Sequence, residues 1–188
     1  MLTDKIKWLG HAAFRVDGSK TIYFDPFRID AGRKADIIFV SHKHYDHCSK
    51  EDILKILKPD TKIVTESDSA KILGLDNMII VKPYDKFAIN GIEIEALPAY
   101  NLTKPNHPKE NGWLGFLIKM DNVSIYHAGD TDLIEEMKHI TADVALIPVY
   151  PDNKYVMNPE EAAQATFNLN VRVIVQIHYG DIGGSEKD

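Results

Sequence analysis

Short apolar segments rich in valine, isoleucine, phenylalanine and tyrosine recur along the chain and constrain its fold most strongly. They lie at residues 22–24, 37–40, 78–81, 92–97, 116–120, 123–126, 144–149 and 171–177, and runs of this kind are typical of β-strands. Helical patterns lie at residues 49–57, 68–73, 132–139 and 158–168, and residues 121–122 form a predicted tight hairpin turn. Because hairpins followed by alternating strands and helices occur twice, the sequence predicts a layered α/β fold with two similar halves, with two sheets between helices.

Length, composition and charge narrow the class of protein. The length of 188 residues predicts a single domain, residues 1–188. Hydrophobic residues make up 44% of the chain and charged residues 27%, a composition that excludes disordered and fibrous proteins. The formal net charge of −6 disfavours a nucleic-acid partner. No segment approaches the ~20 apolar residues of a membrane span, and the N-terminal residues do not resemble a secretory signal. We therefore expect a cytoplasmic protein with no membrane span.

A histidine cluster follows the apolar run at residues 37–40. His42, His44 and His47 are three of the eight histidines in the chain, and Asp46 lies among them. In open α/β sheets ligands gather at the carboxyl ends of strands, where this segment lies. Imidazole and carboxylate groups are ligands of zinc and similar divalent ions. Because alternate residues of an extended loop point the same way, His42 and His44 can hold one ion, while Asp46 and His47 project toward a second.

Two ions need more ligands than this cluster supplies. Asp130 follows the strand predicted at residues 123–126, where its carboxylate could bridge both ions. His178 follows the last predicted strand and offers an imidazole. Taken alone, each residue could equally be a helix cap or a structural histidine, but together with the first cluster they predict a dinuclear site.

These residues resemble the signature of the metallo-β-lactamase fold superfamily, His-x-His-x-Asp-His, which His42, His44, Asp46 and His47 match completely. The similarity covers most of the chain and also includes the segments at residues 9–14, 24–27, 127–131 and 178–180. They look like the small metal-dependent hydrolase branch, which is similar to ascorbate-phosphate lactonases and N-acyl-phosphatidylethanolamine phospholipases. The resemblance implies an αββα sandwich of two mixed β-sheets flanked by helices, with a two-metal site.

The same resemblance implies how the ligands divide between the ions. His42 and His44 would hold the first ion, Asp46, His47 and His178 the second, and Asp130 would bridge them. One position departs from the pattern, because Asn101 stands where relatives place a third histidine for the first ion. His107, in the irregular loop at residues 101–112, is the nearest substitute, and the alternative is an exposed loop histidine. Zinc is the expected metal, and manganese and iron stay open.

Other residues near these motifs have structural interpretations. His11 and Asp25 could orient ligands by hydrogen bonds, or serve only in turns. His127 is expected in the core or beside a ligand, and Cys48 as a small buried residue. The candidate pocket residues are Tyr100, Asn101, His107, Trp113, Tyr150, Tyr155 and Met157. Two lysines, Lys104 and Lys109, could bind a substrate phosphate or carboxylate, or could simply be solvated.

The leading functional hypothesis is a metal-dependent hydrolase in which metal-bound hydroxide attacks a small ester-type substrate, a phosphodiester, lactone or thioester. Asp46 and Asp130 would orient this nucleophile and accept its proton. The alternatives are a catalytically silent metal-binding protein with a regulatory or interaction role, motivated by Asn101, and a di-iron redox protein. The sequence leaves two further features open: whether the last helix and strand of the fold are missing or trimmed after His178, and whether a partner chain covers an exposed sheet edge in a homo-oligomer.

Overall fold

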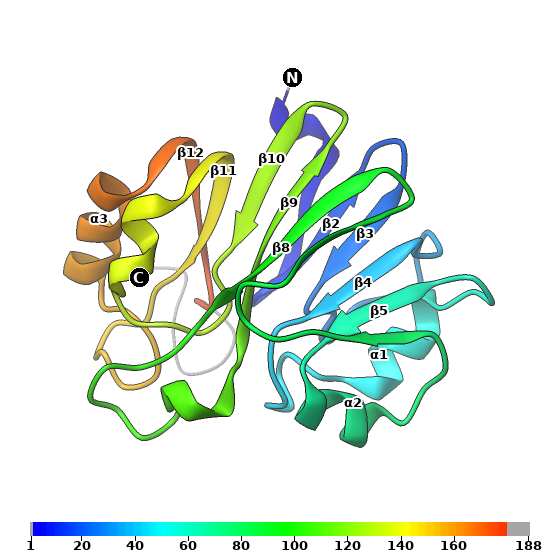
Figure 1. Cartoon of the computed structure of the whole chain (residues 1–188), viewed down its shortest axis with the longest axis horizontal. Helices are drawn as coiled ribbons and strands as arrows, with labels where there is room; N and C mark the ends of the chain where they lie inside the picture. Colours follow the sequence, from blue (N-terminus) through cyan, green and yellow to red (C-terminus); the bar gives the residue numbers. More distant parts are fainter. Residues whose placement is uncertain (1, 180–188) are drawn as a thin grey trace. The chain divides into compact units, whose positions relative to one another are not determined.

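The chain folds into two compact units, one ending at Val81 and the other beginning at Lys82 (Figure 1). The structure is a computed structural model that describes residues 2–179. Each unit contains one mixed six-stranded β-sheet, and three α-helices accompany the sheets in the described residues. The predicted α/β fold with two mixed sheets flanked by helices is confirmed. The expectation about a last helix and strand concerns residues outside those described.

The first unit is a sheet with the strand order β1-β2-β3-β4-β5-β6. Its antiparallel strands are β1 (Ile6–Gly10), β2 (Ala13–Asp17) and β3 (Thr21–Phe24), which follow the 3-10 helix η1 (Leu2–Lys5). From β3 onward the strands are parallel: β4 (Ile37–Val40), β5 (Lys62–Thr65) and β6 (Met78–Ile80). The carboxyl ends of β3 and β4 therefore lie at the same edge, where the β1–β2 turn also lies because β2 is antiparallel to β3.

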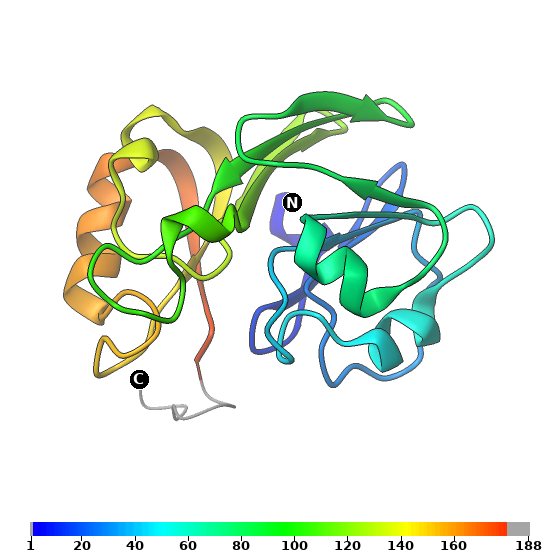
Figure 2. The same cartoon turned by 60° about the horizontal axis from the view of Figure 1, so that its bottom comes forward.

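Helices α1 (Lys50–Ile56) and α2 (Ser67–Leu73) pack on one face of this sheet, and Figure 2 shows both beside its strands. Ile53 and Ile56 of α1 are fully buried and share a core cluster with Ile38 and Ile63 of the sheet. The Ser49 hydroxyl accepts a hydrogen bond from the Asp52 N–H at 3.3 Å, which caps the first turn of α1. The cap fixes where the histidine loop ends and the helix begins.

The second unit repeats this plan with the strand order β12-β11-β10-β9-β8-β7. Its antiparallel strands are β7 (Lys86–Ile89), β8 (Ile92–Pro98), β9 (Leu114–Met120) and β10 (Val123–His127), and β11 (Thr141–Pro148) and β12 (Asn170–Ile177) continue parallel to β10. Two 3-10 helices, η2 (Lys109–Asn111) and η3 (Glu135–His139), interrupt the connections. The strands β8, β10, β11 and β12 all end at one edge of the sheet.

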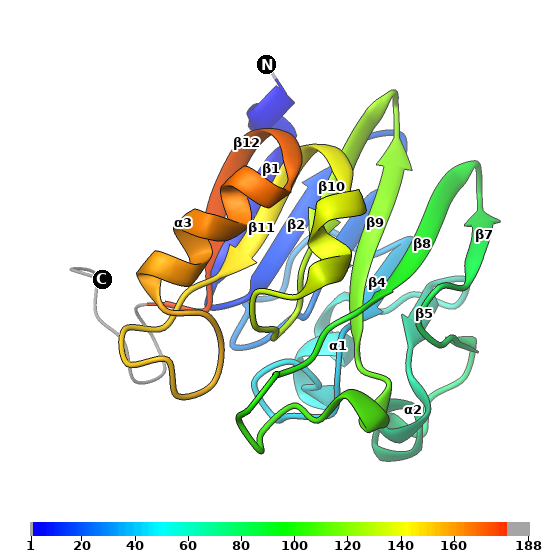
Figure 3. The same cartoon turned by 60° about the vertical axis from the view of Figure 1, so that its left-hand side comes forward.

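Helix α3 (Pro159–Asn168) lies along β11 and β12, as Figure 3 shows. Its start is encoded locally, because Asn158 and Glu161 form a capping box and Pro159 occupies the first turn. Ala162 and Ala165 are buried against the sheet in a cluster that includes Met157. Among the described residues no helix is both long and apolar enough to cross a membrane.

Most elements lie where the sequence predicts them, and the differences have local causes. Asp121 and Asn122 form the β9–β10 turn with φ angles of 53° and 62°, so the predicted hairpin is confirmed. The helix predicted at residues 132–139 is wrong in type and length, since only the 3-10 helix η3 (Glu135–His139) forms there. Four short strands, β1, β2, β5 and β7, lie outside the apolar runs that identified the others.

Candidate metal centre

The histidine loop of the first unit begins directly after β4 and brings its ligand atoms together in pairs. His42 Nε2 lies 3.1 Å from His44 Nδ1, and His47 Nε2 lies 3.8 Å from Asp46 Oδ2. His42, Asp46 and His47 are buried, and His44 is half-buried. The loop therefore presents one pair of imidazoles and one imidazole–carboxylate pair, which is the division that the spacing predicts.

Asp25, after β3, anchors two of these histidines from behind. Its Oδ2 lies 2.8 Å from His47 Nδ1 and accepts the Ser41 hydroxyl hydrogen at 2.6 Å. Its Oδ1 accepts the Ser41 N–H at 2.7 Å, and the Ser41 Oγ lies 2.9 Å from His42 Nδ1. Asp25 has a φ of 41°, a left-handed conformation that a non-glycine residue adopts at a cost. The orienting role that the sequence left open for Asp25 matches this geometry, whereas Ser41 was missed.

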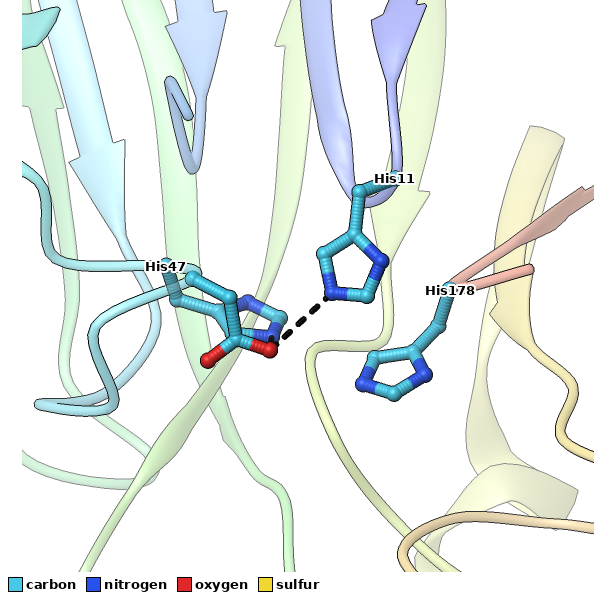
Figure 4. Close-up of side chains that lie close together, drawn as sticks. His11, His47 and His178 are labelled. Atoms are coloured by element: carbon cyan, nitrogen blue, oxygen red, sulfur yellow. Dashed lines mark hydrogen bonds and ion pairs between the residues drawn. The ribbon is translucent and has the colours of Figure 1, made fainter. Parts of the chain in front are cut away.

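His11, in the β1–β2 turn, belongs to the same group. Its Nε2 lies 3.1 Å from Asp46 Oδ2, shown by the dashed line in Figure 4, where His11 and His47 are labelled. The ligand atoms of His11, Asp46 and His47 all lie within 4.8 Å of one another. His11 is fully buried and has a φ of 48°. Besides orienting Asp46, His11 is therefore placed so that its imidazole could itself bind an ion.

The second unit gathers its candidate ligands around one carboxylate oxygen. Asp130 Oδ2 lies 3.2 Å from His107 Nε2 and 3.2 Å from His178 Nε2. Asp130 follows β10, and His178, also drawn in Figure 4, follows the end of β12 with a φ of 65°. All three side chains are buried. One oxygen at equal distance from two imidazoles is suited to bridging two cations.

His107 comes from the loop between β8 and β9 and is not an exposed loop histidine, since its exposed fraction is 1%. Asn101 holds it through three hydrogen bonds: the Asn101 N–H donates to the His107 carbonyl at 2.7 Å, the His107 N–H donates to Asn101 Oδ1 at 3.1 Å, and His107 Nδ1 lies 3.0 Å from the same Oδ1. Trp113 packs edge-on against the imidazole with ring centroids 5.3 Å apart. The residue that breaks the family pattern therefore positions the nearest imidazole.

Two polar clusters fasten this loop to the rest of the second unit. Lys104 forms an ion pair with the buried Asp132 and donates to the Val156 carbonyl at 2.8 Å. Lys109 donates to the Tyr100 hydroxyl at 3.0 Å and to Glu136 Oε1 at 3.1 Å, and these hydrogen bonds raise the Lys109 pKa. The Lys104 side chain is 13% exposed, whereas that of Lys109 is 60% exposed, and both lysines have anionic partners, so substrate binding by these lysines would compete with ion pairs.

The other predicted neighbours of the site are structural. His127 is fully buried, and its Nδ1 accepts the Gly129 N–H at 3.2 Å in the turn that leads to Asp130. Cys48 is buried as expected, and burial raises the pKa of its thiol to about 11. Among the candidate pocket residues, Met157 and Tyr100 lie in the core cluster of the second unit.

The chemistry of these donors fits divalent metal ions. The candidate ligand atoms are imidazole nitrogens and carboxylate oxygens, and the neighbouring pairs lie about 3 to 4 Å apart, as neighbouring ligands of a single ion do. Oxygen atoms of Asp25, Ser41 and Asn101 lie within hydrogen-bond distance of the second ring nitrogen, Nδ1, of three histidines and can accept its hydrogen, an arrangement that is characteristic of metal-binding imidazoles. Fold and donor set together define a metallo-hydrolase type of centre.

Comparisons with known proteins agree with this class. The sequence profile of the β-lactamase superfamily domain matches residues 5–178. A UPF0173 metal-dependent hydrolase of Thermococcus onnurineus is 34% identical over 192 residues, which cover 93% of this chain and 84% of the relative. The chain belongs to the β-lactamase superfamily and, within it, to the UPF0173 metal-dependent hydrolases.

Solved structures give the same assignment. A crystal structure described as a metal-dependent hydrolase from Parabacteroides distasonis superposes with a TM-score of 0.86 at 33% identity, covering 94% of this chain and 82% of that one. A protein from Thermotoga maritima, described as a zinc-dependent hydrolase of the metallo-β-lactamase superfamily, gives 0.66 at 26% identity, covering 94% and 76%. The predicted metallo-β-lactamase fold and hydrolase family are therefore confirmed.

Proposed function

We propose that the protein is a hydrolase of small ester-type substrates, a phosphodiester, lactone or thioester, and that two divalent ions, zinc in the first instance, form its catalytic centre. His42, His44 and His107 would hold the first ion, and Asp46, His47 and His178 the second. Asp130 would bridge them. The description of the Thermotoga maritima relative as zinc-dependent supports the choice of metal.

The observation that carries this proposal is the position of Asp130 Oδ2, 3.2 Å from both His107 Nε2 and His178 Nε2. The family resemblance implies that His178 would hold the second ion, and His107 is the substitute proposed for the first, so a single oxygen between the two imidazoles is consistent with a bridging ligand. The same geometry weakens the case for a silent metal-binding protein, which was motivated by a missing imidazole at Asn101. In this proposal His107 would supply that imidazole, and Asn101 itself would hold it in place.

Side chains of the protein would bind the ions, orient the attacking water and accept its proton. Divalent ions bound there would lower the pKa of water toward about 7 and polarise the oxygen of the bond to be broken. Asp46 and Asp130 would orient the attacking water and accept its proton. The hydrogen bond to His11 at 3.1 Å would fix which oxygen of Asp46 faces the reaction. Asp25 and Ser41 would keep His42 and His47 from turning.

A substrate screen with ion analysis tests the proposal. Protein reconstituted with zinc, manganese or iron would be assayed against phosphodiester, lactone, thioester and β-lactam substrates, with ion content measured on the same sample. We expect turnover of at least one ester class, with about two ions per chain, and nearly complete loss in His44→Ala and Asp130→Ala proteins that stay folded. Unchanged turnover in both variants would refute the proposal. Ion binding without turnover would favour the silent alternative, and stoichiometric iron with a visible charge-transfer band would favour the redox one.

A further inference from the structure

Asn101 stands where the family pattern has a histidine, and the structure gives it a different task. We propose that Asn101 is a positioning residue that keeps the ring hydrogen of His107 on Nδ1, so that Nε2 is the atom offered to the first ion. This inference rests on the proposed metal centre. It assigns the ring form of one ligand and names the residues that enforce it.

The orientation of the Asn101 carboxamide follows from two backbone groups that can each play only one role. The His107 N–H, which can only donate, lies 3.1 Å from Oδ1. The Tyr155 carbonyl, which can only accept, lies 3.0 Å from Nδ2. Turning the carboxamide over would place its NH2 group against the His107 N–H, donor against donor, and its oxygen against the Tyr155 carbonyl, acceptor against acceptor. Oδ1 therefore faces His107, and Nδ2 faces Tyr155.

This orientation decides the ring form of His107. Its Nδ1 lies 3.0 Å from Oδ1, which can only accept, so Nδ1 must carry the hydrogen and donate it. In the neutral ring Nε2 then carries the lone pair that a metal ion needs, and this atom lies 3.2 Å from Asp130 Oδ2. The opposite ring form would set two acceptors against each other at Asn101. In that form the Nε2–H could donate to Asp130, but Nε2 would have no lone pair to offer an ion.

Asp132 and Lys104 hold Asn101 in turn. Asp132 Oδ1 accepts the second hydrogen of Asn101 Nδ2 at 3.0 Å and forms the ion pair with Lys104, while its Oδ2 accepts the Leu102 N–H at 2.8 Å. The exposed fractions of the Lys104 and Asp132 side chains are 13% and 5%. A buried carboxylate fixed by three donors leaves the carboxamide one favourable orientation. The chain of contacts thus runs from Lys104 through Asp132 and Asn101 to His107.

Nitrogen NMR of the histidine side chains tests the inference. In ion-free protein, we expect His107, identified by the signals that vanish in His107→Gln, to carry a hydrogen on Nδ1, and any hydrogen that Nε2 also carries toward Asp130 Oδ2 to be lost when zinc is added, while Nδ1 keeps its hydrogen. In Asn101→Ala the ring should populate both forms, and zinc affinity at one site should fall by about 10- to 100-fold. Asn101→Asp keeps an oxygen facing His107 and should keep the hydrogen on Nδ1, but its second oxygen would face the Tyr155 carbonyl and Asp132 Oδ1, so this variant should also have a lower free energy of unfolding.

The matched control is Asn106→Ala, because Asn106 lies in the same loop and its side chain donates only to the Lys154 carbonyl, at 3.0 Å, among the described contacts. It should leave both the ring form and zinc affinity unchanged. A ring that carries its hydrogen on Nε2 and none on Nδ1 in the ion-free wild type, or an Asn101→Ala protein with unaltered ring form and affinity, would overturn the inference. An unshifted Nε2 in zinc-loaded protein that otherwise binds two ions would instead remove His107 from the proposed centre.

Discussion

Single carboxylates organise the candidate ligands of each unit. Asp25 contacts His47 directly and His42 through the Ser41 hydroxyl, whereas Asp130 places one oxygen between His107 and His178. Asp25 contacts the ring nitrogen Nδ1 of His47, on the side away from the ligand atom Nε2, and so orients the ring. Asp130 instead faces the ligand atoms Nε2 of His107 and His178. Substituting the two should therefore have different consequences: loss of Asp25 misdirects ligands, and loss of Asp130 removes one.

Asp25→Asn tests the orienting role. An amide nitrogen in place of Oδ2 would face the Ser41 hydroxyl and His47 Nδ1, so at least one hydrogen bond must break. We expect zinc affinity, measured by competition with a chromophoric chelator, to fall by about 10- to 100-fold, the usual cost of losing such a partner. Asp60→Asn, at a side chain that is 79% exposed, is the control and should bind zinc normally. Wild-type affinity in Asp25→Asn would argue against the role.

The sequence predicted the histidines of the site better than the residues that hold them. His42, His44, Asp46 and His47 stand out because they are close in sequence, but Ser41 is an ordinary residue whose hydroxyl matters only once β3 brings Asp25 alongside. His107 could be named only as a neighbour of the position that departs from the pattern. Its place beside Asp130 depends on a loop conformation that short-range patterns do not determine.

Secondary-structure elements position the site through their ends, and α1 is the example closest to the histidine loop. Asp52, in its first turn, accepts hydrogen bonds from the Ser49 hydroxyl at 2.6 Å, from the Arg28 and Ile29 N–H groups at 2.9 and 3.1 Å, and from Lys55 at 2.9 Å. Burial alone would raise the Asp52 pKa, but hydrogen bonds from Ser49, Lys55 and Arg28 outweigh it and hold the pKa below its ordinary value. One carboxylate thus joins the helix to the segment after β3.

Asp52→Asn should lower the free energy of unfolding at pH 7 by about 1–3 kcal/mol, because the anionic acceptor of several donors is lost. A lowered carboxyl pKa stabilises the fold above the ordinary pKa of 3.8, and this contribution is lost as the pH falls toward the folded-state value. The difference in free energy of unfolding between wild type and variant, measured by urea unfolding, should therefore become smaller as the pH falls below about 4. Glu51→Gln, at a neighbouring side chain that is 88% exposed, is the control. A gap independent of pH would contradict the argument.

Gly115 in β9 tests how closely the strands approach the turn before Asp130. A Cβ atom there would lie 2.9 Å from the Ala128 carbonyl oxygen and 3.0 Å from that of His127, both backbone atoms that cannot turn away. Gly115→Ala should cost about 1–3 kcal/mol of stability and weaken zinc binding by displacing Asp130. At Gly32, the atoms nearest an added Cβ are the side-chain ends Tyr23 Oη and Arg15 Nη1, at 3.3 and 3.6 Å, so Gly32→Ala should cost less. Equal melting temperatures for the two variants would count against this explanation.

At the scale of the whole molecule, the two units are built alike. Each has a mixed sheet in which antiparallel strands lead to parallel ones, and each carries its candidate ligands after strand ends at one edge. The two similar halves were predictable because apolar runs and helix caps repeat in the sequence. The strands β1, β2, β5 and β7 were not identified individually, because short or half-polar strands resemble loops until their partners form.

Ion binding by residues of both units should couple metal to overall stability. Zinc at about 100 times its dissociation constant should add about 2.7 kcal/mol to the free energy of unfolding per site, and a chelator should remove the gain. The measurement is thermal unfolding with and without zinc in the wild type, His44→Ala and Asp130→Ala. Both variants should respond less than the wild type. A full zinc response in either variant would mean that the substituted residue is not a ligand.

The number of ions bound per chain tests the central claim most directly. After equilibration with zinc and removal of the excess, elemental analysis should find about two ions in the wild type and at most about one in the His44→Ala protein of the first unit and in the Asp130→Ala protein of the second. One ion or none in the wild type, or two in both variants, would contradict a shared dinuclear centre.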